Sequence, residues 1–142
     1  MNIFRPALQI VLGFVIATAA AASETTQLRD TADKLFAAFN RHDIDAMIKL
    51  YAADAEIISP DHQKTLHGPE GARAIYAPLF AQFPDLHDRV VTMTAQDHRI
   101  AVEFVSTGCA APPNKCFELP IASVLTLRDG RIVRDVSYFD AP

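Results

Sequence analysis

The sequence lacks the residue patterns from which nucleotide, nucleic-acid and serine-hydrolase sites are built. It has only five glycines in 142 residues, and they are spread along the chain, so no glycine-rich phosphate loop can form. The Gly-x-Ser-x-Gly turn of serine hydrolases is missing too. Lysine and arginine are scattered, and the formal net charge is −4, whereas phosphate binding needs a basic patch. We therefore expect neither a nucleotide nor a nucleic-acid partner. There is also no internal repeat, low-complexity stretch or linker.

Cysteine is nearly absent as well, with Cys109 and Cys116 as the only two. Their spacing is not the Cys-x-x-Cys of a redox pair, and two thiolates lack the further ligands that zinc takes. The segment Pro112-Pro113-Asn114 between them has strong turn-forming chemistry. We predict a structural disulfide across a hairpin loop, with two free thiols as the alternative.

Residues 1–22 have the pattern of a secretory signal peptide. Arg5 precedes an apolar run over 7–19, and three alanines follow it. The run is shorter than the roughly 20 residues that a transmembrane helix needs. We predict cleavage after Ala22 and a single secreted or periplasmic domain over 23–142, without a membrane contact of its own. A retained N-terminal anchor is the alternative.

The first half of that domain predicts three helices. Thr25 or Thr26 can cap the first, Asp43 can cap a second that ends in Tyr51, and Pro69 suits the first turn of a third. Pro78 should kink the third helix or end its regular part, and the element stops at 83–84. The apolar stripes at helical spacing are Leu28, Ala32, Leu35, Phe36 and Phe39; Ile44, Met47, Ile48 and Tyr51; and Ile75, Tyr76, Leu79, Phe80 and Phe83.

The remaining segments have the alternation of β-strands. A short strand carrying Ala55, Ile57 and Ser59 lies between the second and third helices. Four more follow at 86–95, 99–108, 117–127 and 131–140, and tight turns such as Asp129-Gly130 make neighbours antiparallel. The predicted class is α+β: three N-terminal helices packed over the concave face of a cone-shaped, curved, mixed but mostly antiparallel sheet. Such an arrangement leaves a pocket between the helices and the sheet.

The last strand places a carboxylate among apolar residues. Val133, Asp135, Ser137 and Phe139 share one face, and Ile132, Arg134, Val136 and Tyr138 share the other. If the first face looks into the helices, desolvation raises the pKa of Asp135 and makes it a proton shuttle near neutral pH. The alternative is an open face, or a structural acid neutralised by Arg89 or Arg134.

Two other polar groups have ordinary structural interpretations. Ser59, Asp61, His62 and His67 gather near the end of the first strand, but they match no metal-ligand motif, so we predict no metal and expect His67 to cap the turn before the third helix. Glu103 should form a cross-strand or interface ion pair.

Four segments resemble one known family. The runs LFAAFNRHDIDAMIKLYAADAEIISP, HGPEGARAIY, FPDL and LTLRDGRIVRDVSYFD look like a SnoaL-like domain of the nuclear-transport-factor-2-like superfamily, and the resemblance covers about Leu28 to Asp140. It implies the cone-shaped fold. It does not fix an activity, because the superfamily contains isomerases, polyketide cyclases, epoxide hydrolases, dehydratases and non-catalytic binding domains.

The catalytic residues of characterised members do not carry over. Other side chains stand at their positions: Leu35, Ser59 and Ala122 for the ketosteroid isomerases, Phe104, Ser106 and Ser137 for the limonene-epoxide hydrolases, and Ser123 for the SnoaL-type ester cyclases. By the same resemblance, Asp135 falls on an inward-facing position of the last strand.

These observations predict an exported domain that binds a small hydrophobic molecule without a cofactor. It is either an isomerase or cyclase, in which Asp135 moves a proton next to a carbonyl while Ser59 or Tyr76 holds the oxygen, or a non-catalytic binding or interaction module. The predicted pocket also includes Ile57, Phe80, Val102, Phe104, Ser106, Ala122, Val124, Ser137 and Phe139. The second face of the sheet, with Ala101, Val105, Val136 and Tyr138, is apolar enough to predict a homodimer.

Overall fold

The computed structural model describes residues 10–110 and 115–140, which form three helices and one six-stranded sheet. The elements are α1 (Ile10–Asn40), α2 (Ile44–Ile48), β1 (Tyr51–Ile58), β2 (Leu66–His67), α3 (Gly68–Gln82), β3 (His87–Gln96), β4 (Arg99–Ala110), β5 (Lys115–Arg128) and β6 (Arg131–Tyr138). The strand order is β2-β1-β6-β5-β4-β3, in which only β1 and β6 pair in parallel. The predicted α+β class with a mixed, mostly antiparallel sheet is therefore confirmed.

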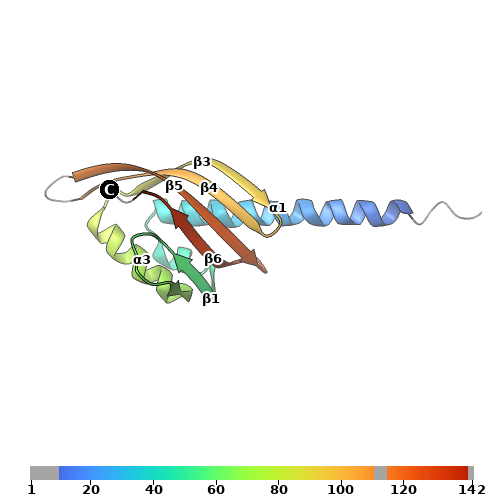
Figure 1. Cartoon of the computed structure of the whole chain (residues 1–142), viewed down its shortest axis with the longest axis horizontal. Helices are drawn as coiled ribbons and strands as arrows, with labels where there is room; N and C mark the ends of the chain where they lie inside the picture. Colours follow the sequence, from blue (N-terminus) through green and yellow to red (C-terminus); the bar gives the residue numbers. More distant parts are fainter. Residues whose placement is uncertain (1–9, 111–114, 141–142) are drawn as a thin grey trace, which may run out of the picture.

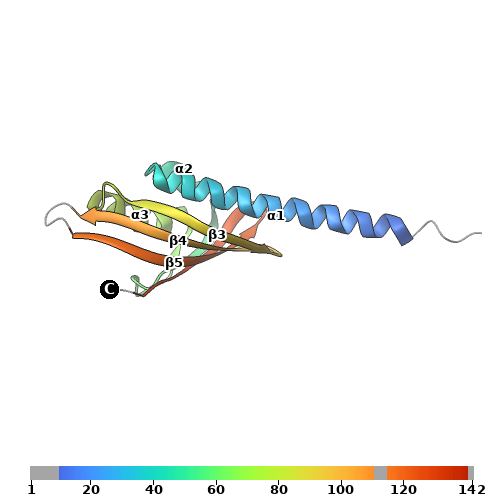
Figure 2. The same ribbon diagram turned by 90° about the horizontal axis from the view of Figure 1, so that it is seen from above.

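The helices pack on one side of the bent sheet, and the first part of α1 extends beyond its end (Figure 1 and Figure 2). Apolar side chains of the helices and of the facing strands form one core. Aromatic rings join the layers: Phe36 of α1 meets Phe104 of β4 edge to face, with ring centroids 4.9 Å apart, and Phe39 meets Phe80 of α3 at 5.1 Å. Edge-to-face packing of this kind adds to the gain from burying the rings.

Two predicted helix boundaries were wrong. The helix α1 runs without a break from Ile10, so Thr25 and Thr26 lie inside it, and the hydroxyl of Thr26 donates back to the carbonyl of Ala22 at 2.9 Å. A threonine can make this bond within a helix, so its presence does not mark a cap. Tyr51 does not end a helix but opens β1. In the described part of the chain, no helix is both long and apolar enough to cross a bilayer.

Tyr51 is a strand residue because its backbone pairs with β6. It pairs with Ile132 in the parallel β1–β6 ladder, and the backbone N–H of Ile132 donates to the carbonyl of Leu50 at 2.8 Å. This long-range pairing overrides the helical spacing that the local sequence shows. The two-residue strand β2, which the sequence did not reveal, pairs with the other side of β1.

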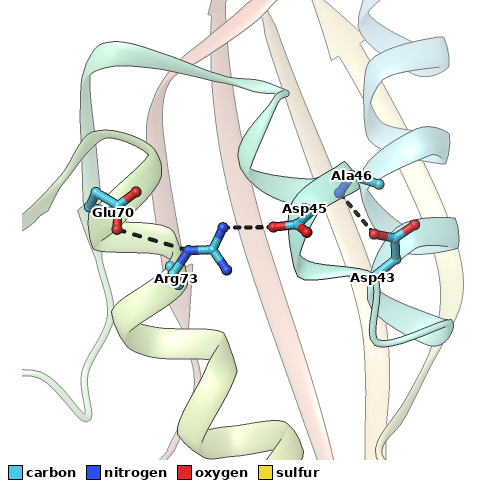
Figure 3. A network of polar contacts seen from close by, with 5 residues as sticks. All are labelled: Asp43, Asp45, Ala46, Glu70 and Arg73. Atoms are coloured by element: carbon cyan, nitrogen blue, oxygen red, sulfur yellow. Dashed lines mark hydrogen bonds and ion pairs between the residues drawn. The ribbon is translucent and has the colours of Figure 1, made fainter.

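The helices α2 and α3 begin where the sequence predicted, and a polar network joins them (Figure 3). The Asp43 carboxylate accepts the backbone N–H of Ala46 at 2.9 Å, so Asp43 is the predicted N-cap. Next to it, the guanidinium of Arg73 in α3 donates to Asp45 at 2.7 Å, and its Nε lies 3.9 Å from Glu70. The hydrogen bond from Arg73 lowers the pKa of Asp45, which keeps this link ionised.

The end of the regular helix that was one of the two predicted effects of Pro78, and the predicted cap at His67, are not found in α3. Pro69 lies in the first turn as predicted, but the helix continues past Pro78 to Gln82, and the N–H of Phe83 still reaches the Leu79 carbonyl at 2.9 Å. His67 occupies the N-cap position, yet its side chain makes no capping hydrogen bond. It belongs instead to β2 and pairs with Glu56.

The β3–β4 and β5–β6 hairpins are tight, as the turn residues predicted. Asp97 and Asp129 have positive φ angles of 53°, and Gly130 has 73°, so the two-residue turns have the handedness that suits twisted strands. Cys109 and Cys116 lie directly opposite each other on β4 and β5 and form the predicted disulfide. The turn-forming residues 112–114 lie outside the described part of the chain.

Gly68 and Gly130 offer a matched test of the backbone at the start of α3. Both have positive φ, but a Cβ at Gly68 would lie 2.6 Å from the backbone oxygen of Ala53, whereas at Gly130 it would meet only the flexible end of Gln27. We expect Gly130→Ala to lower the free energy of unfolding by about 1 kcal/mol, and Gly68→Ala by about 3 kcal/mol or more, since strain and a backbone clash then add. Urea denaturation measures both, and equal losses would contradict the close approach of α3 to β1.

Candidate functional site

A cavity of about 210 Å³ lies between the helices and the concave face of the sheet. Its wall is mostly apolar and receives side chains from all three helices and from β1, β3, β4, β5 and β6. The ionisable groups in the wall, apart from Tyr76, are Asp61, Asp88 and Asp135, and none of the lining residues is Lys, Arg or His. The cavity is therefore an apolar space with carboxylates and no basic side chain in its wall.

Asp135 lies on this wall and is bound by a buried tyrosine. It is 4% exposed, and the hydroxyl of Tyr51 donates to its Oδ2 at 2.7 Å. Burial raises the pKa of Asp135 to about 6, and the hydrogen bond from Tyr51 acts in the opposite direction. Within the described ranges, no hydrogen-bond partner reaches the other carboxylate oxygen, Oδ1. This oxygen is the one available to a ligand.

Tyr51 and Tyr76 extend the hydrogen-bonded chain. Their hydroxyl oxygens lie 3.4 Å apart, which is long for a bond between hydroxyls, and Tyr76 also lines the cavity. Burial raises the pKa of both phenols far above the ordinary value, and the nearby Asp135 charge adds to the shift. Both tyrosines therefore stay protonated and act as neutral donors at any ordinary pH.

A bulge in β6 turns Asp135 inward. The pairing with β5 shifts between Thr126 and Leu127, so Leu127 faces Ile132 while Thr126 faces Arg134. The extra residue, Val133, breaks the strict alternation. Ile132 is consequently fully buried in the same core as the helices, and the prediction that it faces away from Asp135 was wrong. Arg134 faces the other way, with its Nε 3.8 Å from Glu56, so it does not neutralise Asp135.

Asp88 on β3 is a second buried acid, which the sequence analysis missed. It is 5% exposed, and its Oδ1 has no hydrogen-bond partner among the described residues. Burial raises its pKa to about 7, and the hydroxyl of Ser106, directly opposite on β4, works against this shift. The alternation of Leu86, Asp88 and Val90 along the strand was the available signal, because it puts the acid on the same face as two apolar residues.

Most residues predicted for the pocket do line the cavity, but four do not. Those at the wall are Ile57, Ser59, Tyr76, Phe104, Ser106, Asp135, Ser137 and Phe139. Phe80 instead packs against Phe39 and stacks on the His42 ring at 4.2 Å. Val102 is completely buried in the core without reaching the cavity wall.

The other two misplaced residues, Ala122 and Val124, show that the predicted facing of β5 was wrong. They lie on the outer side of the sheet, whereas Ile121, Ser123 and Leu125 line the cavity. Apolar residues stand on both faces of this strand, so alternation alone could not choose between them. The register with β6 decides it: Ser123 pairs with Ser137, and their hydroxyl oxygens are 2.8 Å apart on the cavity floor.

The predicted polar cluster near the end of β1 forms a small network. The Ser59 hydroxyl donates to Asp61, and the Nδ1 of His62 lies 3.0 Å from the same carboxylate oxygen. Partial burial tends to raise the pKa of Asp61, but the bonds from Ser59 and His62 outweigh it and the pKa is lowered. In the described ranges, no three His, Cys, Asp or Glu residues converge as a metal site would require. Glu103 is exposed on the outer face, and no ion pair of it is found among the same residues.

The two buried acids predict an unusual pH dependence of stability. An unfolded aspartate titrates near pH 4, whereas the folded protein holds these protons up to about pH 6 at Asp135 and about pH 7 at Asp88. The stabilisation of the folded state by these two protonated carboxyl groups is thus complete below pH 4, and it is lost as the pH rises to 7. From Asp135 alone we expect a loss of about 3 kcal/mol, taking about 1.4 kcal/mol for each pKa unit.

Urea denaturation between pH 4 and pH 8 measures this loss. Asp135→Asn and Asp88→Asn should each flatten part of the slope, whereas Glu118→Gln, at an exposed position of β5, should leave it unchanged. A double variant with the slope of the original protein would contradict the burial of both acids.

Comparisons with known proteins agree with this architecture. Three solved structures superpose well: a candidate SnoaL-like polyketide cyclase from Jannaschia sp. CCS1 (TM-score 0.73, 23% identity, 82% of this chain and 87% of that one), the candidate polyketide cyclase IdmH from Streptomyces antibioticus (0.71, 27%, 80% and 92%), and a cystatin-fold protein from Novosphingobium aromaticivorans (0.66, 21%, 77% and 95%). A search of curated proteins finds no match.

The sequence model of the SnoaL-like domain matches residues 32–135, which is most of the chain and includes α2, α3 and five of the six strands in full. With the predicted cone-shaped fold present around its cavity, the chain belongs to the SnoaL-like domain family of the nuclear-transport-factor-2-like superfamily.

Proposed function

We propose that the protein binds a small, mostly apolar carbonyl compound in its cavity and transfers a proton next to the carbonyl without a cofactor. The observation that carries the proposal is the position of Asp135, which is buried at the cavity wall, has one free oxygen and has no basic partner among the described residues. A carboxylate with a pKa of about 6 is ionised at neutral pH, yet basic enough to accept a proton from carbon.

The arrangement gives each group one task. The free oxygen of Asp135 takes a proton from the carbon next to the carbonyl, and the negative charge moves to the carbonyl oxygen. Tyr76 can donate to that oxygen, because its side chain lines the cavity and its hydroxyl makes only the long contact to Tyr51. In an isomerisation, Asp135 then returns the proton to another atom. In a cyclisation, the enolate carbon attacks a second carbonyl, and the alkoxide formed there takes the proton back from Asp135. Tyr51 orients Asp135 and does not touch the ligand.

Tyr76 is better placed to bind the carbonyl oxygen of the ligand than Ser59, the other residue predicted for this role. The Ser59 hydroxyl already donates to Asp61, and breaking that bond would leave a partly buried carboxylate with one donor fewer. Ser59 therefore contributes shape to the wall and keeps Asp61 ionised. Two of the three predicted catalytic residues, Asp135 and Tyr76, remain in the proposed mechanism.

Exchange of carbon-bound protons tests the role of Asp135. Nuclear magnetic resonance in deuterated buffer follows deuterium incorporation next to the carbonyl in a panel of small cyclic ketones, extended by any molecule that native mass spectrometry finds bound to protein from its own host. We expect catalysed exchange that rises with pH through about 6, because Asp135 must be ionised. Asp135→Asn should slow it about 100-fold or more.

The control for that experiment is Glu118→Gln, which removes an equal charge from the exposed face of β5 and should leave the exchange rate unchanged. Unchanged rates in a folded Asp135→Asn variant would rule out Asp135 as the base.

A second function, as an interaction module, is favoured by the outer face of the sheet. Val91 and Tyr138 are each 57% exposed there, and with Val105, Pro120 and Ala122 they line a shallow groove. Exposed apolar surface of this kind is typical of a protein interface. We propose that two copies pair through this face. We also propose that the chain is exported, because a disulfide suits an oxidising compartment.

Protein purified from its own host tests both statements. Export with cleavage after Ala22 predicts Ser23 as the first residue in N-terminal sequencing, and pairing through the outer face predicts a dimer in sedimentation at micromolar concentration. Tyr138→Glu should give monomers without loss of the fold, because it places a charge on the proposed interface. A monomeric original protein, or one that starts at Met1, would contradict the corresponding statement.

A further inference from the structure

Asp88 is a buried carboxylate for which the proposed proton transfer has no use. Its side chain lines the same cavity as Asp135. It comes from the edge strand β3, and β4 and β5 lie between that strand and β6, which carries Asp135. Its Oδ1 is covered and has no hydrogen-bond partner among the described residues. A buried polar atom left without a partner costs free energy. A rotation of the carboxylate that brings this oxygen to the cavity would let a ligand supply the missing donor.

The backbone at Asp88 is held from two sides, by α1 and by β4. The Asn40 side chain at the end of α1 accepts the N–H of Asp88 at 2.8 Å and donates to its carbonyl at 2.9 Å. On the other side, Ser106 lies directly opposite Asp88 in the β3–β4 ladder. The backbone that carries the carboxylate is thus held in place before a ligand arrives, which lowers the ordering cost of binding.

The electrostatics of the cavity favour a positively charged donor over a neutral one. Among the described residues, the wall has three carboxyl groups and no basic side chain. Aromatic rings surround this space, and Phe104, a diagonal neighbour of Asp88 across the ladder, faces the cavity as well. A cation gains from both groups, since carboxylates attract it directly and the faces of aromatic rings attract it through their quadrupoles.

We propose that the ligand of this cavity carries a protonated amine and that Asp88 binds it, which leaves the other end of the ligand for Asp135. This inference rests on the proposed ligand-binding cavity and narrows its ligand to small aryl or alkyl ammonium compounds. The size is consistent with one ring and a short chain, because the volume of 210 Å³ exceeds the roughly 150 Å³ in which a protein cavity can hold benzene.

A pair of matched probes tests the charge. Isothermal titration calorimetry at pH 7.5, roughly physiological, compares 2-phenylethylammonium with 2-phenylethanol, which has the same shape and can donate a hydrogen bond but carries no charge. We expect the ammonium to bind the full chain at least about tenfold more tightly, a difference of about 1.4 kcal/mol. Equal affinities, or no measurable affinity for the ammonium at millimolar concentration, would overturn the proposal.

Variants assign that preference to one carboxylate. Asp88→Asn keeps the shape and removes the charge, so it should bring the two affinities to within about twofold while leaving that of the alcohol unchanged. Glu118→Gln removes an equal charge from the outer surface and should keep the full preference. A preference lost in Asp135→Asn but kept in Asp88→Asn would overturn the assignment to Asp88.

The probes separate this proposal from the proposed catalysis. Neither probe contains a carbonyl, so their binding does not depend on proton transfer, and the ketone exchange by Asp135 does not depend on an amine. Ammonium selectivity without ketone exchange would support the Asp88 site and count against the base. Exchange without selectivity would do the reverse.

Discussion

The hydrogen bond from Tyr51 to Asp135 joins the first strand to the last, and the cavity depends on it. These residues are 84 positions apart in the sequence, and they meet because β1 and β6 pair in parallel in the middle of the sheet. A carboxylate in such a place needs a strong partner, since burial without one is costly. Tyr51 supplies it from a completely buried position. The bond therefore links β1 to β6 and holds the acid at the cavity wall.

The same bond explains why Asp135 is suited to chemistry. A guanidinium partner would lower the pKa and hold the carboxylate ionised over the whole useful range. A tyrosine is a weaker partner, and it leaves the pKa raised at about 6. It also occupies only one of the two oxygens, so the other stays available to a ligand. Asp88 is also buried, but its side chain is paired differently. Asn40 bonds only its backbone, and one side-chain oxygen has no partner among the described residues.

This chain has the cone of its superfamily, but by resemblance it lacks the catalytic side chains of the characterised members. By resemblance, the sites of the characterised isomerase and cyclase acids are occupied by serine or alanine here, as at Ser59 and Ala122. In the structure, the two buried acids of the cavity wall lie instead at Asp88 on β3 and Asp135 on β6, and the third acid of the wall is the more exposed Asp61. A cone lined by several strands permits such relocation, because side chains from many positions reach one central space. The cavity and its two buried acids also reduce stability.

Sequence alone determined the class, the number of long strands, the tight turns, the disulfide and the inward direction expected for Asp135. These follow from local rules: period-two alternation, turn residues such as Asp129-Gly130, and two cysteines set about a turn. Only the tertiary structure decided that Tyr51 is a strand residue, that Ser123 rather than Ala122 faces the cavity, and that the Oδ1 of Asp88 has no hydrogen-bond partner among the described residues. Each of these depends on pairing between distant strands or on a bulge, and β5 is apolar on both faces, so no local pattern could reveal which side would be covered.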